Sequence, residues 1–133
     1  MCNILTGKLK TLPIMTFNFL IVFSSIVTGA IGLIGGIIFL KNPPKKINWW
    51  YGYRTKRSME NQEKWDFAQK IGAENMIKYS SIPFLTTIFG FLIDKQYIVL
   101  SFGIVTISAL LWAFFSIYKT ETKLKSEFNK KEK

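Results

Sequence analysis

The sequence predicts an all-α, polytopic membrane protein with three transmembrane helices and a short amphipathic interfacial helix in the first cytoplasmic loop. Three long stretches contain no charged residue: residues 12–40, 79–93 and 96–118. An α-helix needs about 20 mainly apolar residues to cross the hydrocarbon core of a bilayer. The connector between the first two stretches, residues 41–78, holds nine of the 18 Lys and Arg residues. We therefore expect a single membrane domain over residues 1–133.

The first span is expected at about residues 14–40. A cleaved signal peptide is the alternative, but its apolar core runs about 7–15 residues and the uncharged run here is about twice that length. The run passes directly into Lys41 and the basic, proline-containing segment 42–46. This edge favours a retained span.

Small residues recur every four positions along the first span: Ser24, Thr28, Gly32 and Gly36. Such a stripe lets another helix approach closely within a membrane. Its partner is either the hairpin formed by the later spans or a second protein, which leaves a homo-oligomer open. Packing within the chain is the favoured interpretation of this helix-packing stripe.

The second span, about residues 76–93, is the short one. Its uncharged part would rise only about 22 Å, against a hydrocarbon core of about 30 Å. Two further apolar residues extend the span if Lys78 places its ammonium group at the interface. Pro83 lacks a backbone donor, which costs little near a helix start and would kink the helix in mid-span. A turn at residues 94–96 then leads into the third span, about residues 97–118, as an antiparallel hairpin.

The basic residues predict the orientation of the chain. The connector and the segment 119–133 together carry 15 of the 18 Lys and Arg residues. With three spans these segments share one side, and Lys and Arg accumulate on the cytoplasmic side of a membrane. We therefore expect a multi-pass protein of the cell membrane with its N-terminus outside. The loop at residues 41–75 and the basic tail at 119–133 are expected in the cytoplasm.

Composition excludes several kinds of chemistry. The net charge of +10 lies beside the spans, where it attracts lipid headgroups, and no motif that enters a nucleic-acid groove accompanies it. Cys2, interpreted as an incidental thiol, is the only cysteine, and histidine is absent. An intrachain disulfide, a Cys/His zinc site and a His-based triad are therefore excluded. We expect the lipid bilayer as a partner, and no nucleic acid, metal, cofactor or enzymatic activity.

The connector is expected to carry an aromatic group and a helix. Four aromatic residues follow the first span: Trp49, Trp50, Tyr51 and Tyr53. Rings of this kind settle at the depth of the lipid headgroups. Ser58 or Asn61 is expected to cap the helix, which would lie along the membrane surface or under the bundle. Its apolar face consists of Trp65, Ala68, Ile71 and Gly72.

The two arginines of the chain lie close together in the connector. Arg54 and Arg57 stand against 16 lysines. An arginine presents a planar fork of donors that grips a carboxylate, a phosphate or several carbonyl oxygens. Two interpretations of Arg54 remain open: it holds a fixed partner, within the loop or beyond it, or it only adds charge near lipid phosphates.

The connector resembles the signature of the SdpI family of small bacterial membrane proteins, of the sporulation-delay toxin immunity type. That signature reads roughly Gly-[Phe/Tyr]-Arg-Thr-x-x-[Ser/Thr], then a short acidic stretch and Trp-x-x-Ala-Asn. The matching residues here are Gly52, Arg54, Thr55, Ser58, Trp65 and Ala68. Gln69 stands where the family has Asn. One span before the motif and two after it also resemble the family arrangement.

The resemblance implies protection of the cell from a secreted membrane-active peptide, and signalling to a repressor through the loop. A peptide toxin and a cytoplasmic regulator would then be partners, bound through the motif residues 52–69. The alternative is a structural or accessory protein in which the motif only locks the loop against the helices. A small transporter has less support, because no charge lies deep in a span.

Overall fold

The computed structural model describes residues 3–93 and 97–131, which form four helices and no strand. The helices are α1 (Asn3–Lys41), α2 (Gln62–Tyr79), α3 (Ser81–Leu92) and α4 (Ile98–Lys131). The predicted all-α class is confirmed. Cys2 and the predicted turn at residues 94–96 lie outside the described residues.

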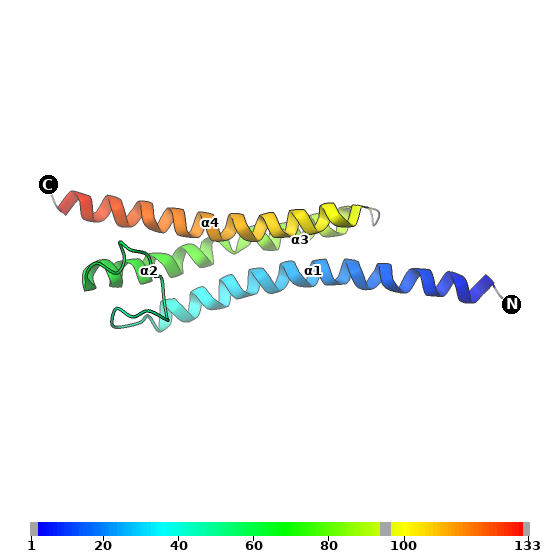
Figure 1. Ribbon diagram of the computed structural model, residues 1–133, viewed down its shortest axis with the longest axis horizontal. Coiled ribbons are helices and arrows are strands. Elements are labelled where there is room, and N and C mark those ends of the chain that lie inside the picture. The colour runs from blue at the N-terminus through cyan, green and yellow to red at the C-terminus, as the bar shows by residue number, and fades with distance from the viewer. Residues whose placement is uncertain (1–2, 94–96, 132–133) are drawn as a thin grey trace.

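The helices form an elongated bundle. Figure 1 shows α2 and α3 following one another in a line beside α1, with α4 returning alongside them. Both α2 and α3 pack against α1 and α4. The connector and the C-terminal end of α4 lie at the same end of the bundle, whereas α1 begins at the opposite end (Figure 1). The two most basic segments are therefore neighbours.

Two helices are long and apolar enough to cross a membrane. The stretches are Val22–Lys41 in α1 and Val99–Asn129 in α4. Large apolar side chains on the outer faces of the helices are exposed, for example Ile31, Leu85 and Leu110. Exposed apolar surface of this kind marks a site of contact with lipid or with another protein. The membrane character of two spans thus agrees with the sequence.

The expected second span is divided at Ser80. Pro83 has no N–H group, so the Tyr79 carbonyl loses its usual helical donor. The Ser80 N–H donates to the carbonyls of Met76 and Ile77, at 3.1 and 3.3 Å. Helix α3 alone has 12 residues and rises about 18 Å. A third crossing would therefore also need the C-terminal turns of α2.

Helix α2 begins where the sequence predicts. Asn61 is its N-cap, because its side chain accepts a hydrogen bond from the Lys64 N–H at 2.8 Å. The four residues of the predicted apolar face are buried, apart from half-buried Ile71. The helix packs lengthwise between α1 and α4, in line with α3. The placement of this helix on the membrane surface or under the bundle, which the sequence led us to expect, stays a prediction.

Polar side chains join α2 to α4 along their length. Asn75 Nδ2 donates to Thr120 Oγ1 at 2.9 Å, and Ser116 Oγ donates to the Asn75 carbonyl at 3.4 Å. Trp112 Nε1 donates to the Met76 carbonyl at 3.2 Å. Buried polar groups without a partner are costly, so these bonds fix the register of the two helices.

Glycines bring α1 close to the other helices. A Cβ atom at Gly32 would lie 2.7 Å from Trp112 Cζ2, and one at Gly36 would lie 2.6 Å from Ile77 Cγ1. Both glycines therefore face helices of their own chain, which is the interpretation that the sequence favoured. The other two residues of the predicted stripe are the exposed Ser24 and the half-buried Thr28.

We expect Gly36→Ala to destabilise the protein by about 1–3 kcal/mol, the usual cost of overpacking. Its Cβ atom would lie 3.0 Å from the Ala73 carbonyl oxygen, and backbone does not move aside easily. Gly35→Ala is the matched control, because the nearest atom there, Met76 Cε, is 3.6 Å away. Thermal unfolding in detergent measures the difference. Equal stability of the two variants would contradict the close approach of α1 and α2.

Candidate functional site

The connector turns sharply at Gly52. Its φ angle is +102°, a conformation that glycine adopts without strain. A Cβ atom here would collide with Gln69 Oε1 and lie 2.7 Å from Pro44 Cγ. Backbone conformation and space therefore both require glycine at this position of the motif.

Gln69 of α2 holds the residue that follows the turn. The Tyr53 N–H donates to Gln69 Oε1 at 2.7 Å, and Gln69 Nε2 donates to the Tyr53 carbonyl at 2.8 Å. The glutamine is buried, so its amide satisfies both main-chain groups of Tyr53. Gln69, which is longer than the Asn of the signature, therefore makes two hydrogen bonds to the main chain of Tyr53.

Thr55 and Ser58 close the next turn of the connector. The Thr55 N–H donates to Ser58 Oγ at 2.8 Å, and the Ser58 N–H donates to Thr55 Oγ1 at 3.3 Å. This is a reciprocal pair of side-chain to main-chain bonds of the kind that stabilises turns. Ser58 is fully buried. Thr55 and Ser58 thus stabilise the turn of the connector between them.

Glu121 of α4 interacts with three side chains of this loop. Thr55 Oγ1 donates to Glu121 Oε1 at 2.6 Å, and the Tyr53 hydroxyl donates to the same oxygen at 3.1 Å. Arg57 Nη1 lies 3.8 Å from Glu121 Oε2. We call these four residues the loop–α4 contact. Hydrogen bonds to an ionised acceptor are stronger than neutral ones, so this contact ties the connector firmly to α4.

Tyr53 stays protonated in this contact. Burial, and then the negative charge of Glu121 and the hydrogen bond to it, raise the pKa of Tyr53 above its ordinary value of 10.0. The phenol is therefore neutral over the whole physiological range. It remains a hydrogen-bond donor to Glu121 throughout.

Trp65 and Ala68 pack beneath the connector. Trp65 is fully buried, and its Nε1 donates to the Pro44 carbonyl at 2.8 Å. Ala68 forms a buried cluster with Leu124 and Phe128 of α4. The second half of the motif thus supports the loop from α2.

Arg54 bonds to a residue outside the motif. It is exposed, and its Nη1 donates to the carbonyl of Trp49. One nitrogen of its guanidinium group is therefore bonded within the loop, and both sequence interpretations of Arg54 stay predictions. Arg57, the other arginine, is the one that lies near a carboxylate.

Sequence reasoning missed Glu121, which joins the motif to α4. The available signal was weak: it is the first carboxylate after the third uncharged stretch. Its role depends on α4 continuing as a helix well beyond residue 118. Asn75 was missed as well, because an amide in mid-helix gives no sign of its partner.

The carboxylates of the connector lie mainly on the exposed side. Lys64 Nζ donates to Glu60 at 2.7 Å, and this bond lowers the pKa of Glu60. Asp66 accepts from Gln62 Nε2 at 2.7 Å, and Glu74 is half-buried. In residues 3–93 and 97–131, no group of three or more Asp, Glu and Cys side chains could hold a metal ion.

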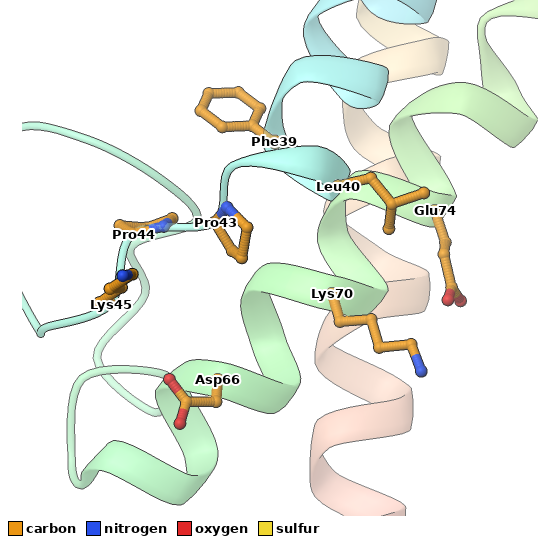
Figure 2. A pocket seen from close by; sticks show the side chains of 8 residues that line it. All are labelled: Phe39, Leu40, Pro43, Pro44, Lys45, Asp66, Lys70 and Glu74. Atoms are coloured by element: carbon orange, nitrogen blue, oxygen red, sulfur yellow. The ribbon is translucent and has the colours of Figure 1, made fainter.

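A cavity of about 630 Å³ adjoins the connector. Its lining comes from the last turn of α1, from Pro43, Pro44 and Lys45, and from one side of α2. Figure 2 shows Asp66, Lys70 and Glu74 on successive turns of α2 along this cavity. Apolar groups on α1 and charged groups on α2 thus line one hollow.

The described residues define an all-helical protein with two helices suited to a membrane and a bonded motif loop at one end. Residues 45–117 match the SdpI/YfhL protein family. This segment is more than half of the chain and includes the connector motif. The protein therefore belongs to the SdpI/YfhL family.

The chain is also similar to the uncharacterized protein YfhL of Bacillus subtilis (strain 168). The two are 44% identical over 54 residues, which make up 41% of this chain and 49% of that protein. The matched part thus spans about half the length of this relative. No solved structure matches the chain.

We expect Glu121→Ala to loosen the connector. Tyr53 and Thr55 would both lose an ionised acceptor, and such bonds contribute about 1.5–3 kcal/mol each. Opening of the loop should become about tenfold more frequent, or more. The initial rate of tryptic cleavage after the exposed Lys56, in detergent, measures this opening. Glu127→Ala, an exposed carboxylate of the same helix, is the control; equal cleavage rates in the two variants would contradict the loop–α4 contact.

Proposed function

We propose that this protein is an immunity-type membrane protein that protects the cell from a secreted membrane-active peptide. Membership of the SdpI/YfhL family and two helices apolar enough to cross a membrane support the proposal. The observation that carries it is the double attachment of the motif loop. Gln69 ties the loop to α2, and Glu121 ties it to α4.

The double attachment offers a route from the membrane to the cytoplasm. Helix α4 is uninterrupted from Ile98 to Lys131, so a tilt of its apolar part also moves Glu121. A peptide that inserts beside the apolar faces of the bundle would change the packing of α1, α3 and α4. Thr55 and Tyr53 would then shift with α4, and the loop would present a different surface to a cytoplasmic regulator.

We also infer three crossings, with the connector and the C-terminal end in the cytoplasm and the N-terminus outside. Residues 76–93, from the end of α2 through α3, supply the second crossing. Lys78 is exposed, so its ammonium group can reach the interface. The basic connector and the basic end of α4 lie together (Figure 1), which supports the orientation. The first half of α2 then lies on the cytoplasmic side.

Labelling of single cysteines tests this orientation. In a Cys2→Ser background, we expect Ser126→Cys to react with a membrane-impermeant maleimide only after the cells are opened. The unaltered chain, whose only cysteine is Cys2, should react in intact cells. Labelling of Ser126→Cys in intact cells would refute the orientation.

Resistance of a sensitive host tests the proposed activity. Expression of the chain should raise the inhibitory concentration of a secreted peptide toxin of the sporulation-delay type. Arg54→Lys keeps the charge but loses the planar fork, so we expect it to lose most of this protection at unchanged abundance. Lys56→Arg, at an exposed neighbouring position, is the control. Full resistance with Arg54→Lys would remove Arg54 from the mechanism.

A structural or accessory role is the second candidate, and one observation favours it. Several motif side chains bond within the chain, as Gln69 does to Tyr53 and Trp65 does to Pro44. Such bonds hold the loop in place and leave fewer groups for a partner. The two roles differ in one readout. A structural role predicts that resistance and protein abundance fall together in Arg54→Lys, whereas the immunity role predicts a loss of resistance without a loss of protein.

A further inference from the structure

The cavity beside the connector is built from two kinds of wall. Phe39 and Leu40 supply apolar surface from the last turn of α1, and the segment Pro43–Lys45 continues that wall. Two hydrogen bonds hold this segment against α2. Trp65 Nε1 donates to the Pro44 carbonyl, and Gln62 Nε2 donates to the Lys45 carbonyl, both at 2.8 Å. These bonds hold the connector side of the cavity against α2.

The cavity carries charges of both signs in equal number. Lys45 and Lys70 are cationic, and Asp66 and Glu74 are anionic. In the described ranges 3–93 and 97–131, none of the four takes part in an ion pair. Lys70 is four residues from both Asp66 and Glu74 on α2, a spacing that permits pairing, but the structure forms neither pair. The cavity thus presents two cations and two carboxylates outside any ion pair beside an apolar wall, and one of the carboxylates, Asp66, accepts a hydrogen bond from Gln62.

The place of the cavity in the fold indicates the depth at which it opens. Phe39 and Leu40 are near the end of the apolar stretch Val22–Lys41. The exposed Ile37 and Ile38 continue the apolar surface along α1 away from the connector. The charged wall begins where that stretch ends. Hydrocarbon gives way to headgroups at such a boundary, so one occupant could span both environments.

We propose that this cavity binds the headgroup of phosphatidylethanolamine, a proposal that rests on the membrane placement in the proposed function. Lys45 and Lys70 meet the phosphate, and Glu74, one turn from Lys70 on α2, meets the primary ammonium group. Asp66 stays bonded to Gln62 Nε2. The upper part of the acyl chains lies along Leu40 and the adjoining face of α1. The charge of this lipid, one of each sign, matches the charge of the wall.

Other headgroups match this wall less well. Phosphatidylglycerol has a phosphate but no cation, so it would leave both carboxylates facing an anion. Phosphatidylcholine has a cation without N–H donors, so it would lose the charge-assisted hydrogen bond that a primary ammonium makes to Glu74. The combination of two lysines with two carboxylates therefore selects for a primary ammonium beside a phosphate.

Native mass spectrometry of the full chain in detergent tests the proposal. Phosphatidylethanolamine, its N-methyl and N,N-dimethyl derivatives, phosphatidylcholine and phosphatidylglycerol, all with the same acyl chains, are added at equal concentration. We expect the bound fraction to fall stepwise with each added methyl group. Binding of phosphatidylethanolamine should exceed that of phosphatidylcholine and phosphatidylglycerol by about five- to tenfold, the ratio expected from one lost hydrogen bond. This series uses the unaltered protein, so no variant has to fold.

A matched pair of double variants locates the site. Lys70→Gln with Glu74→Gln should reduce binding of phosphatidylethanolamine to the level of phosphatidylcholine. Lys125→Gln with Glu127→Gln removes the same two charges from an exposed part of α4 and should leave binding unchanged. Equal binding of all lipids, a preference for phosphatidylglycerol, or equal effects of the two double variants would each overturn the proposal.

One further arm separates this site from the proposed function. The peptide toxin is therefore added to the unaltered protein and to the double variant Lys70→Gln with Glu74→Gln. If only the double variant failed to bind the peptide, and the unaltered protein showed no lipid preference, the cavity would be a peptide site and the lipid proposal would be refuted. Resistance of the host is scored independently of lipid binding. Full resistance with equal binding of all lipids would refute the lipid site alone, whereas a clear lipid preference without resistance would refute only the immunity role.

Discussion

The carboxylate of Glu121 determines how the connector lies on the bundle. Its Oε1 atom accepts hydrogen bonds from the hydroxyls of both Thr55 and Tyr53, two half-buried residues of the connector. Tyr53 reaches this position only because Gly52 turns the chain and Gln69 binds the main chain on either side of it. The turn at Gly52, the amide of Gln69 and the carboxylate of Glu121 therefore position the connector together.

The bundle has two ends of different character. Near the connector, Trp65, Ala68 and Leu124 are fully buried, as in the core of a protein in water. Along the rest of α1, α3 and α4, large apolar side chains such as Ile31 and Leu110 stay exposed. Without a hydrophobic gain from water, helices associate through close packing and interhelical hydrogen bonds. Gly32 and the bonds of Asn75 illustrate those two means here.

Local signals in the sequence predicted much of the fold. Uncharged stretches predicted α1 and α4, because the length and composition of a single segment are enough to recognise a membrane span. Asn61 marked the start of α2 because a cap binds the backbone only three residues away. Pro83 was expected to cost little near a helix start and to kink a helix in mid-span, and the structure divides α2 from α3 just before it.

The remaining features depend on contacts between distant segments. Nothing in the sequence near Glu121 shows that Thr55, far away in the chain, donates to it. The lengthwise packing of α2 likewise depends on α1 and α4 both offering it a surface. The sequence marks Gln69 as an amide one methylene longer than the family's Asn. Only the fold shows that this length suits a pair of bonds to Tyr53.

The polar bonds between α2 and α4 have a mechanical consequence. Asn75 bonds to Thr120, and Ser116 bonds back to Asn75, so neither helix can slide along the other without breaking buried bonds. A displacement of α4 would therefore carry α2 with it. The connector is bonded to both helices, so it would move together with them relative to α1.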